Sequence, residues 1–155
     1  MLQLSMPQHS PSHIPLWGRL EWCKAVRLAT KTIRKLTMID GIVGVIIWTE
    51  HMESMTAFYR DTLRLPVHVI RPDFVAFRWG DMRFNIGEHS EVSGKNAEPQ
   101  RIMVNFGTSE IHALHERLTA SGVRFVRTPE REHWGGWVAT FKDPDGNLLQ
   151  LLQAP

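Results

Sequence analysis

The sequence predicts an α+β fold made of two β-α-β-β-β modules, which form a curved mixed sheet around a cavity. Three observations predict it: strand-like apolar runs, two amphipathic helical segments, and an internal repeat that relates two parts of the chain. The modules span about residues 42–90 and 101–153 of a domain that covers residues 38–155, and residues 1–37 form an extension outside it. A chain of 155 residues is long enough for one domain with a buried core.

The N-terminal extension differs from the rest of the chain in composition. Residues 1–15 contain three Pro and three Ser without hydrophobic periodicity, which is typical of disorder. Residues 16–37 are basic and could form an amphipathic helix of the kind found at membrane surfaces or in transit peptides. The alternative is a segment with no part in the fold, with Met38 as the natural first residue.

Charge and cysteine content exclude several classes of protein. Residues 1–37 carry six Lys or Arg and one Glu, whereas residues 38–155 carry 12 Lys or Arg and 15 Asp or Glu. The domain is therefore mildly acidic, and we expect no nucleic-acid partner. No run of 18 apolar residues is present, so we expect no membrane span. Because Cys23 is the only cysteine, no intrachain disulfide can form, and we expect a cytoplasmic protein.

The first module begins with a strand at residues 42–48, an apolar run rich in β-branched residues. Residues 52–65 then place apolar side chains on one face of a helix, and Pro66 ends this helix. That face carries Met52, Met55, Phe58, Tyr59 and Leu63. The other strands are predicted at residues 67–70, 74–80 and 82–87, the last two joined by a turn at Gly80 and Asp81.

The second module repeats this order. A strand at residues 101–107 precedes a helix that Thr108 or Ser109 can cap and that Gly122 ends. Strands follow at residues 123–126, 137–143 and 148–153, with the turn Asp-Pro-Asp-Gly before the last strand. A shift of 56 residues superposes the two helices. It pairs Met55 with Ile111, Phe58 with Leu114 and Pro66 with Gly122.

The domain resembles the vicinal oxygen chelate superfamily in two segments, MESMTAFYRDTLRLPV at 52–67 and GGWVATFKDPDGNLLQLLQ at 135–153. That superfamily includes glyoxalases, extradiol dioxygenases, fosfomycin-resistance enzymes and bleomycin-binding proteins. The resemblance covers residues 42–153 and implies the same duplicated fold. It also implies a homodimer, since relatives of this size commonly complete their clefts with a partner.

The resemblance leads us to expect no metal at the superfamily's usual positions. Its enzymes hold a divalent ion with four His, Gln or Glu side chains, from the first and last strands of each module. These positions fall on Gly44, Asn85, Arg101 and Gln150. Glycine offers no side-chain ligand, arginine is a cation without an acceptor, and two amides are neutral. We therefore predict no cofactor; a divalent metal at a displaced site is the alternative.

Strand alternation predicts which side chains line the cavity instead. The predicted ligand-binding residues are Trp48, Asn85, Arg101, Asn105, Trp134, Trp137 and Gln150. Arg101 could bind a carboxylate or phosphate, or pair with Glu98. Trp48 could stack on a planar ligand or belong to the core, and Trp134 could move as a lid or pack in a simple loop. The two amides at Asn85 and Gln150 could contact a ligand or bond to each other.

Three functions are compatible with this pattern. The first is binding of a small, anionic or planar molecule in a metal-free cavity, as in the bleomycin-binding relatives. The second is a lyase, isomerase or dioxygenase of the glyoxalase type, which would use a displaced metal site or metal-free acid–base chemistry. The third is a protein-interaction module with a collapsed cavity. No catalytic residue can be assigned, because Asn, Gln and Arg do not titrate near neutrality.

Overall fold

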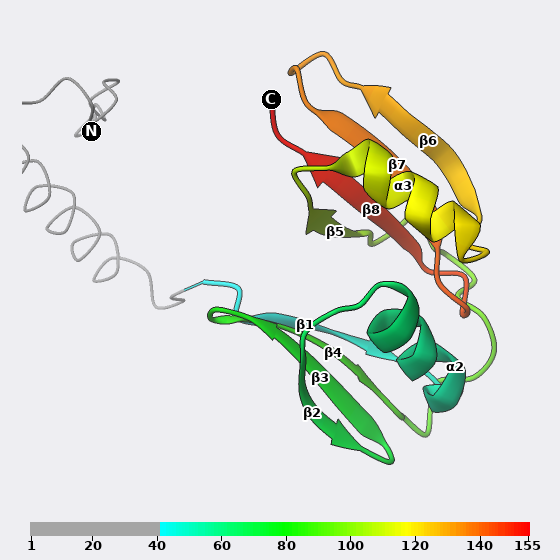
Figure 1. Cartoon of the computed structure of the whole chain (residues 1–155). Helices are drawn as coiled ribbons and strands as arrows, with labels where there is room; N and C mark the ends of the chain where they lie inside the picture. The colour runs from blue at the N-terminus through cyan, green and yellow to red at the C-terminus, as the bar shows by residue number, and fades with distance from the viewer. Residues whose placement is uncertain (1–40) are drawn as a thin grey trace, which may run out of the picture. The chain divides into compact units, whose positions relative to one another are not determined.

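The computed structural model describes residues 41–155. Within this part, Val43–Pro155 form a compact unit of two four-stranded sheets, each with one helical segment on one face (Figure 1). No helix of the described part is long and apolar enough to cross a membrane. The expectations for residues 1–37 and for Met38 lie outside the described residues.

Both modules have the predicted β-α-β-β-β order, which confirms the duplicated fold. The first consists of β1 (Gly44–Trp48), α2 (Met52–Ala57), the π-helical turn η2 (Phe58–Thr62), β2 (Val67–Arg71), β3 (Phe74–Trp79) and β4 (Met82–Gly87). The second consists of β5 (Val104–Gly107), α3 (Ile111–Ala120), β6 (Phe125–Arg131), β7 (Trp137–Lys142) and β8 (Leu148–Gln153). The sixth strand is longer than the predicted run at 123–126, whereas the fifth begins three residues later than predicted.

The two sheets have the same topology. Their strand orders are β1-β4-β3-β2 and β5-β8-β7-β6. In each sheet the first strand pairs in parallel with the last, and the other pairs are antiparallel. The first strand of each module therefore lies at a sheet edge and leaves one side of its backbone without a strand partner among residues 41–155.

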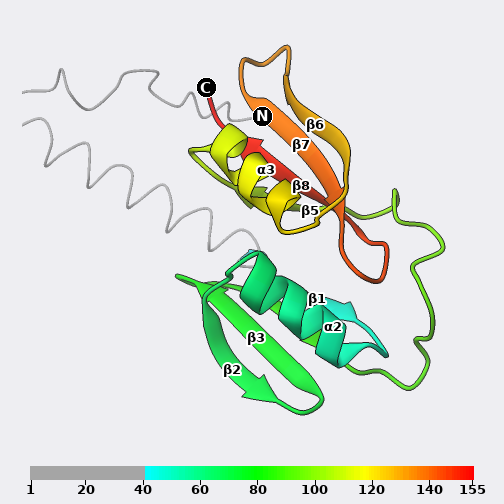
Figure 2. The same cartoon turned by 45° about the vertical axis from the view of Figure 1, so that its right-hand side comes forward.

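A single hydrophobic core joins the helix-covered faces of the two sheets. Phe84 of β4 and Leu149 of β8 are both buried in this core. The ring of Phe84 lies 5.5 Å from that of Phe106, and the ring of Phe58 lies 6.4 Å from that of Phe141. Because side chains alternate along a strand, the opposite face of each sheet points away from this core. The second view shows each helix on one side of its sheet (Figure 2).

The two helices correspond with a different offset from the predicted one. The buried residues Met52 and Tyr59 of the first helical segment match Ile111 and Leu118 of α3, a shift of 59 residues (52 to 111, and 59 to 118). The predicted shift of 56 is therefore wrong. A π-helical turn, in which Leu63 N donates to Phe58 O at 2.9 Å, inserts extra backbone before the first helix ends.

The residue that ends the first helix is Arg64, not Pro66. Arg64 has a positive φ of 59°, as Gly122 has at the end of α3 with a φ of 85°. The left-handed conformation is the usual way to end a helix, and glycine adopts it most readily. The pairing of Pro66 with Gly122 is therefore wrong, because a non-glycine residue takes the left-handed position in the first module.

The N-terminus of α3 is capped from the last strand. The N-cap residue is Glu110, and no side chain of its own caps the helix. Gln153 of β8 instead accepts a hydrogen bond from Ile111 N at 2.8 Å through its Oε1 atom. Thr108 accepts only from Glu110 N, at 3.1 Å, so the prediction of a Thr108 or Ser109 cap is wrong. Sequence-local capping rules could not find an acceptor 42 residues away.

Candidate functional site

The face of the first sheet opposite its helix carries the predicted inward residues of that module. The parallel register of β1 and β4 places Gly44 beside Arg83, Ile46 beside Asn85, and Trp48 beside Gly87. Residues paired in this way point to the same side of a sheet. We call this surface the module-one open face, and it also includes Arg71, Phe74, Ala76 and Arg78.

An aromatic surface lies at one end of the module-one open face. Trp48 is 41% exposed, and its ring lies directly over Gly87. A Cβ atom at Gly87 would lie 3.0 Å from Cζ3 of Trp48 and 3.3 Å from Cδ2 of Phe74. The imidazole of His89 meets the Trp48 ring edge-on at a centroid distance of 5.1 Å. Trp48 is thus a half-exposed platform with a defined position, and not a core residue.

Asn85 lies at the centre of the same face, between Ile46 and Ala76. Its side-chain Oδ1 atom is buried and has no hydrogen-bond partner among the described residues. Buried polar atoms are nearly always paired, so this oxygen is a candidate acceptor for a hydrogen-bond donor from a ligand.

The second sheet has a corresponding open face. Asn105 of β5, Gln150 of β8 and Thr140 of β7 form one row across it. Gln150 Nε2 donates to Thr140 Oγ1 at 3.3 Å, so Gln150 is held by its neighbour and does not bond to Asn85. We call this surface the module-two open face. Asn85 and Gln150 occupy equivalent places in their sheets, as predicted, but each belongs to a separate surface.

Arg101 does not lie on the module-two open face. β5 begins at Val104, so Arg101 belongs to the segment that connects the modules, and the expectation of an inward strand position is wrong. Its side chain is 73% exposed and forms an ion pair with Glu98 through Nε. This is the alternative that the sequence left open for Arg101.

The two tryptophans after β6 have different environments. Trp134 is 43% exposed and lies on Gly136, where a Cβ atom would come within 1.7 Å of its ring. Trp137 points to the helix-covered face, because it alternates with the core residue Ala139 on β7, and its ring lies 4.6 Å from that of His112. Trp137 and Gln150 therefore lie on opposite faces of the second sheet.

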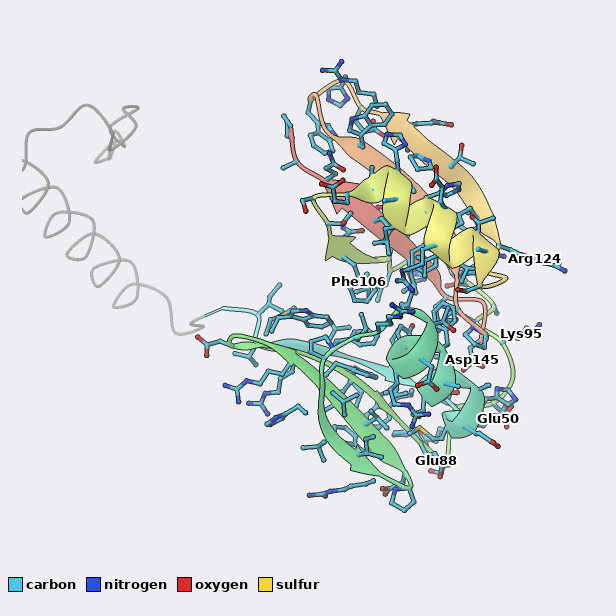
Figure 3. All side chains as sticks on the ribbon, in the orientation of Figure 1. Glu50, Glu88, Lys95, Phe106, Arg124 and Asp145 are labelled. Atoms are coloured by element: carbon cyan, nitrogen blue, oxygen red, sulfur yellow. The ribbon has the colours of Figure 1, made fainter. Side chains whose placement is uncertain are left out.

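Two carboxylates of the turn before β8 form contacts between the modules that the sequence did not reveal. Asp145 is 4% exposed and accepts from Thr49 Oγ1 at 2.5 Å, and its Oδ1 lies 2.8 Å from Nδ1 of His51. Asp143 accepts from the buried hydroxyl of Tyr59 at 2.7 Å. Figure 3 shows Asp145 beside the first helical segment. The only signal in the sequence is the pair of acids in the Asp-Pro-Asp-Gly turn, which turn formation alone would explain.

Burial shifts the pKa values of two groups in this contact, Asp143 and Tyr59. It raises the pKa of Asp143, although hydrogen bonds from Asn147 and Tyr59 oppose the change. Burial, with the nearby Asp143 carboxylate as a second cause, also raises the pKa of the Tyr59 hydroxyl well above its usual value. Tyr59 is therefore a phenol at neutral pH and can donate its proton to Asp143.

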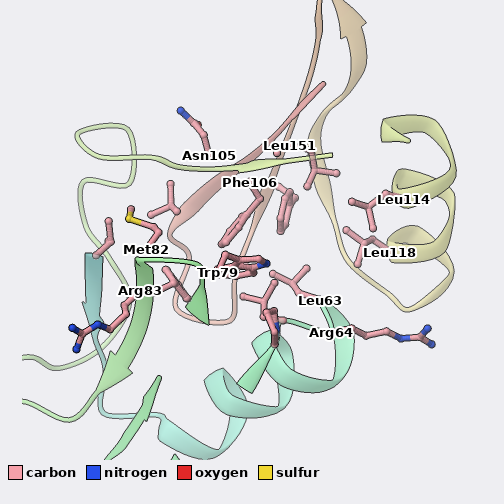
Figure 4. Close-up of a pocket in the computed structure, with 17 residues that line it drawn as sticks. Leu63, Arg64, Trp79, Met82, Arg83, Asn105, Phe106, Leu114, Leu118 and Leu151 are labelled. Atoms are coloured by element: carbon pink, nitrogen blue, oxygen red, sulfur yellow. The ribbon is translucent and has the colours of Figure 1, made fainter. Parts of the chain in front are cut away.

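The structure contains two cavities of similar size near these residues. One of about 400 Å³ is lined by Ile46 and Trp48, by part of the connecting segment and by Leu148. The other, of about 390 Å³, lies between the modules on the helix-covered side and is mainly apolar (Figure 4). In Figure 4 the guanidinium groups of Arg64 and Arg83 point away from its apolar lining. Both volumes are within the usual range of small-molecule sites.

The side chains at the usual metal positions do not fit a divalent cation. Gly44, Asn85 and Gln150 provide no carboxylate, imidazole or thiolate, and the residues level with the two amides, Ile46 and Asn105, provide none either. Arg83, two residues from Asn85 on the same face, adds a positive charge. In the described part of the chain no three His, Cys, Asp or Glu side chains are grouped to hold a metal. Such a donor set is unsuited to a divalent ion.

Comparisons with known proteins agree with the fold. The model of the glyoxalase/bleomycin resistance protein/dioxygenase superfamily matches residues 41–151. A bleomycin resistance protein of Klebsiella pneumoniae is 49% identical over 35 residues, which cover 23% of this chain and 28% of that protein. The uncharacterized protein YetH of Bacillus subtilis is 26% identical over 123 residues, which cover 75% of this chain and all of that protein.

Solved structures show the same architecture at lower identity. A lactoylglutathione lyase from Agrobacterium tumefaciens has a TM-score of 0.61 at 19% identity, over 76% of this chain and 96% of that one. TnmS3, an antibiotic binding protein from Streptomyces sp. CB03234, has a TM-score of 0.63 at 20% identity, over 77% and 99%. The family match over nearly all described residues and the duplicated fold lead to one conclusion: the chain belongs to the glyoxalase/bleomycin resistance protein/dioxygenase superfamily.

Proposed function

We propose that this protein binds a small anionic or planar molecule on its open faces, without a divalent metal at the superfamily's usual positions. The observation that carries the proposal is the row of side chains through Asn85, where an unpaired amide lies between a tryptophan platform and arginine. A planar group can stack on Trp48, and the amides can orient its polar atoms.

The proposed ligand contacts are Trp48 and Asn85 on the module-one open face and Asn105 and Gln150 on the module-two open face. Trp134, which lies over Gly136 in the loop before β7, is a further proposed contact. The first and last strands of each module contain no carboxylate or imidazole, so these four strands offer no side chain for acid–base catalysis near neutrality. This favours binding over turnover. Bleomycin resistance and antibiotic binding, the roles of two of the similar proteins, are consistent with such a role.

A second copy of the chain would complete the cleft. The two open faces point away from the shared core, so neither covers the other within one chain. Apolar side chains are exposed just before and along β1 and just before β5, each of which is one edge strand of its sheet, as expected for a surface that a partner covers. These side chains are Ile42, Val43, Ile46, Ile102 and Met103. We therefore propose a homodimer, and a cytoplasmic location because the chain has a single cysteine.

Calorimetric titration with naphthylbutanoate, a planar acid, in the presence of EDTA tests the binding function. We expect binding that EDTA does not change and that Trp48→Leu weakens about fivefold or more through the loss of stacking. Trp79→Leu is the matched control, because Trp79 is exposed to a similar extent on the helix-covered side. Equal losses in the two variants would contradict a site on the open face.

Elemental analysis and light scattering test the remaining parts of the proposal. A stoichiometric divalent ion in the purified protein that disappears in Gln150→Ala would overturn the metal-free site and favour the glyoxalase-type enzyme. A monomer at all concentrations in gel filtration with light scattering would overturn the homodimer.

A further inference from the structure

The first sheet has an unusual distribution of charge. Its four strands contain three arginines and no aspartate or glutamate. All three arginines, Arg71, Arg78 and Arg83, lie on the module-one open face according to the strand register. This positive surface belongs to a domain whose residues 38–155 carry more acidic than basic residues. The local excess of positive charge therefore does not follow from the composition of the domain.

Two of these arginines lie directly opposite each other. Arg78 of β3 pairs with Arg83 of β4, next to the turn of their hairpin. Directly opposite side chains have Cβ atoms about 5 Å apart, and like charges in this arrangement destabilise a sheet. The Nε atom of Arg78 donates to Gly80 O at 2.7 Å, which orients its guanidinium. On the other side of Arg83 lies Gly44, which has no side chain to cover it.

Three other arginines of the domain, Arg60, Arg101 and Arg127, form ion pairs with nearby acids. In the second sheet, Arg127 pairs with Glu130 at 2.8 Å and with Glu132 at 2.7 Å. Arg60 pairs with Asp61 at 2.7 Å. Within the described residues, by contrast, neither Arg78 nor Arg83 forms an ion pair, although Asp81 lies in the turn between them. The fold thus leaves two adjacent guanidinium groups available to an external anion.

The pair has a defined position relative to the tryptophan platform. Asn85 is two residues from Arg83 along β4, and Gly87, under Trp48, is four residues away. At about 3.3 Å per residue, the arginine pair and the platform are about 13 Å apart, with Asn85 midway. A single elongated molecule can therefore reach all three.

We propose that Arg78 and Arg83 form an oxyanion clamp that selects ligands with a carboxylate, sulfonate or phosphate at one end and a planar apolar group at the other. This inference rests on the proposed binding function and specifies its ligand class. The clamp holds the anion through guanidinium N–H groups, and the planar group stacks on Trp48. Charge-assisted hydrogen bonds stabilise the bound anion, and the negative charge of the anion also reduces the repulsion between the two arginines.

Three probes of the same shape and different charge test the clamp by calorimetry on the full chain: naphthylbutanoate, naphthylbutanol and naphthylbutylamine. We expect the acid to bind about tenfold or more tightly than the alcohol, since a hydrogen bond to a charged group is worth about a factor of ten or more. Arg78→Gln and Arg83→Gln should each reduce this acid-to-alcohol ratio severalfold. Arg124→Gln, an exposed arginine just before β6, should leave the ratio unchanged.

The outcomes separate the clamp from the binding function on which it rests. If acid and alcohol bind equally well, or if the ratio is unchanged in both clamp variants, the clamp is wrong while the binding function stands. If none of the three probes binds, the proposed function and the clamp are both overturned. If the variants lose all three probes alike and light scattering shows that they dissociate into monomers, the arginines serve a contact between copies, and the clamp is again wrong.

Discussion

At the scale of single residues, the absence of a side chain at position 87 shapes the candidate site. Gly87 is buried on β4, and the rings of Trp48 and Phe74 occupy the space that a Cβ atom would need. The position of the platform therefore depends on a glycine that the sequence presents only as the end of a strand. Gly44 is similarly constrained, because a Cβ there would lie 2.8 Å from the carbonyl oxygen of Arg83.

We predict that Gly87→Ala displaces Trp48. The added methyl group would overpack the contact and lower the free energy of unfolding by about 1 kcal/mol, the low end of the usual cost, because a half-exposed ring can move. Urea denaturation measures the free energy, and the emission of Trp48 should shift. Gly107→Ala is the control, since a Cβ there meets nothing within 4 Å and should change stability by less than about 0.5 kcal/mol. Equal effects at the two positions would contradict the packing argument.

At the scale of elements, each helix depends on a feature outside its own amphipathic pattern. The first ends with a π-helical turn followed by Arg64 in the left-handed conformation, and the N-terminus of α3 is capped by the side chain of Gln153. Hydrophobic periodicity correctly predicted both helices and most strands, because side-chain burial on one face is a local pattern. It could not predict an extra residue in the last turn or a cap supplied by a distant strand.

We predict that the Gln153 cap contributes measurably to stability. Gln153→Ala should lower the free energy of unfolding by about 1 kcal/mol, the usual effect of losing a helix N-cap acceptor. Gln153→Glu should keep most of the stability that the cap contributes, because a carboxylate oxygen can also accept from Ile111 N and a negative charge is favourable at a helix N-terminus. Denaturation of both variants beside Gln100→Ala, an exposed control in the connecting segment, would show this. Equal losses in the alanine and glutamate variants would indicate that the cap is not the cause.

At the scale of the whole unit, the turn before β8 connects the second module to the first through hydrogen bonds. Tyr59 donates to Asp143, and Thr49 donates to Asp145, so two buried carboxylates accept from side chains of the other module. Desolvation of such groups is costly and is offset by these hydrogen bonds. The turn that carries the family resemblance is therefore also the contact that positions the modules.

We predict that Asp143 makes stability fall as pH rises from the acid range. Its pKa in the folded protein is raised above the value of about 3.9 expected in the unfolded chain. The contribution of the protonated carboxyl is therefore fully present below that unfolded value and is lost as pH rises through the folded pKa. Asp143→Asn should abolish this dependence. The free energy of unfolding of the variant should therefore rise relative to that of the natural protein as pH increases from the acid range to neutrality.

Urea denaturation at several pH values measures this difference in the free energy of unfolding. Asp73→Asn, in the exposed turn between β2 and β3, is the control and should not show the same trend. A difference that changes in the opposite direction with pH would mean that Asp143 is stabilised in its ionised form.

The candidate site was predictable in part. Strand alternation correctly placed Trp48 and Asn85 on the same face of their sheet and Asn105 and Gln150 on the same face of theirs, because period-two patterns are local. That these two faces belong to separate surfaces, and do not line one cavity, was not predicted. The position of Arg101 was wrong, since where an edge strand begins depends on its pairing partner and not on its own residues. The sequence did not predict that Arg78 and Arg83 lie directly opposite each other, because this depends on the register of the hairpin.

By itself the sequence determined the two-module α+β fold, and it predicted that side chains unsuited to a metal, two of them amides, stand at the superfamily's usual positions. These properties follow from periodicity, turn chemistry and the donor atoms of single residues, which neighbours along the chain do not change. Only the tertiary structure decided that the open faces point away from the shared core, that Asp143 and Asp145 form hydrogen bonds between the modules, and that Arg78 lies opposite Arg83. Each of these depends on residues far apart in the chain, and their proximity is set by packing of the whole unit.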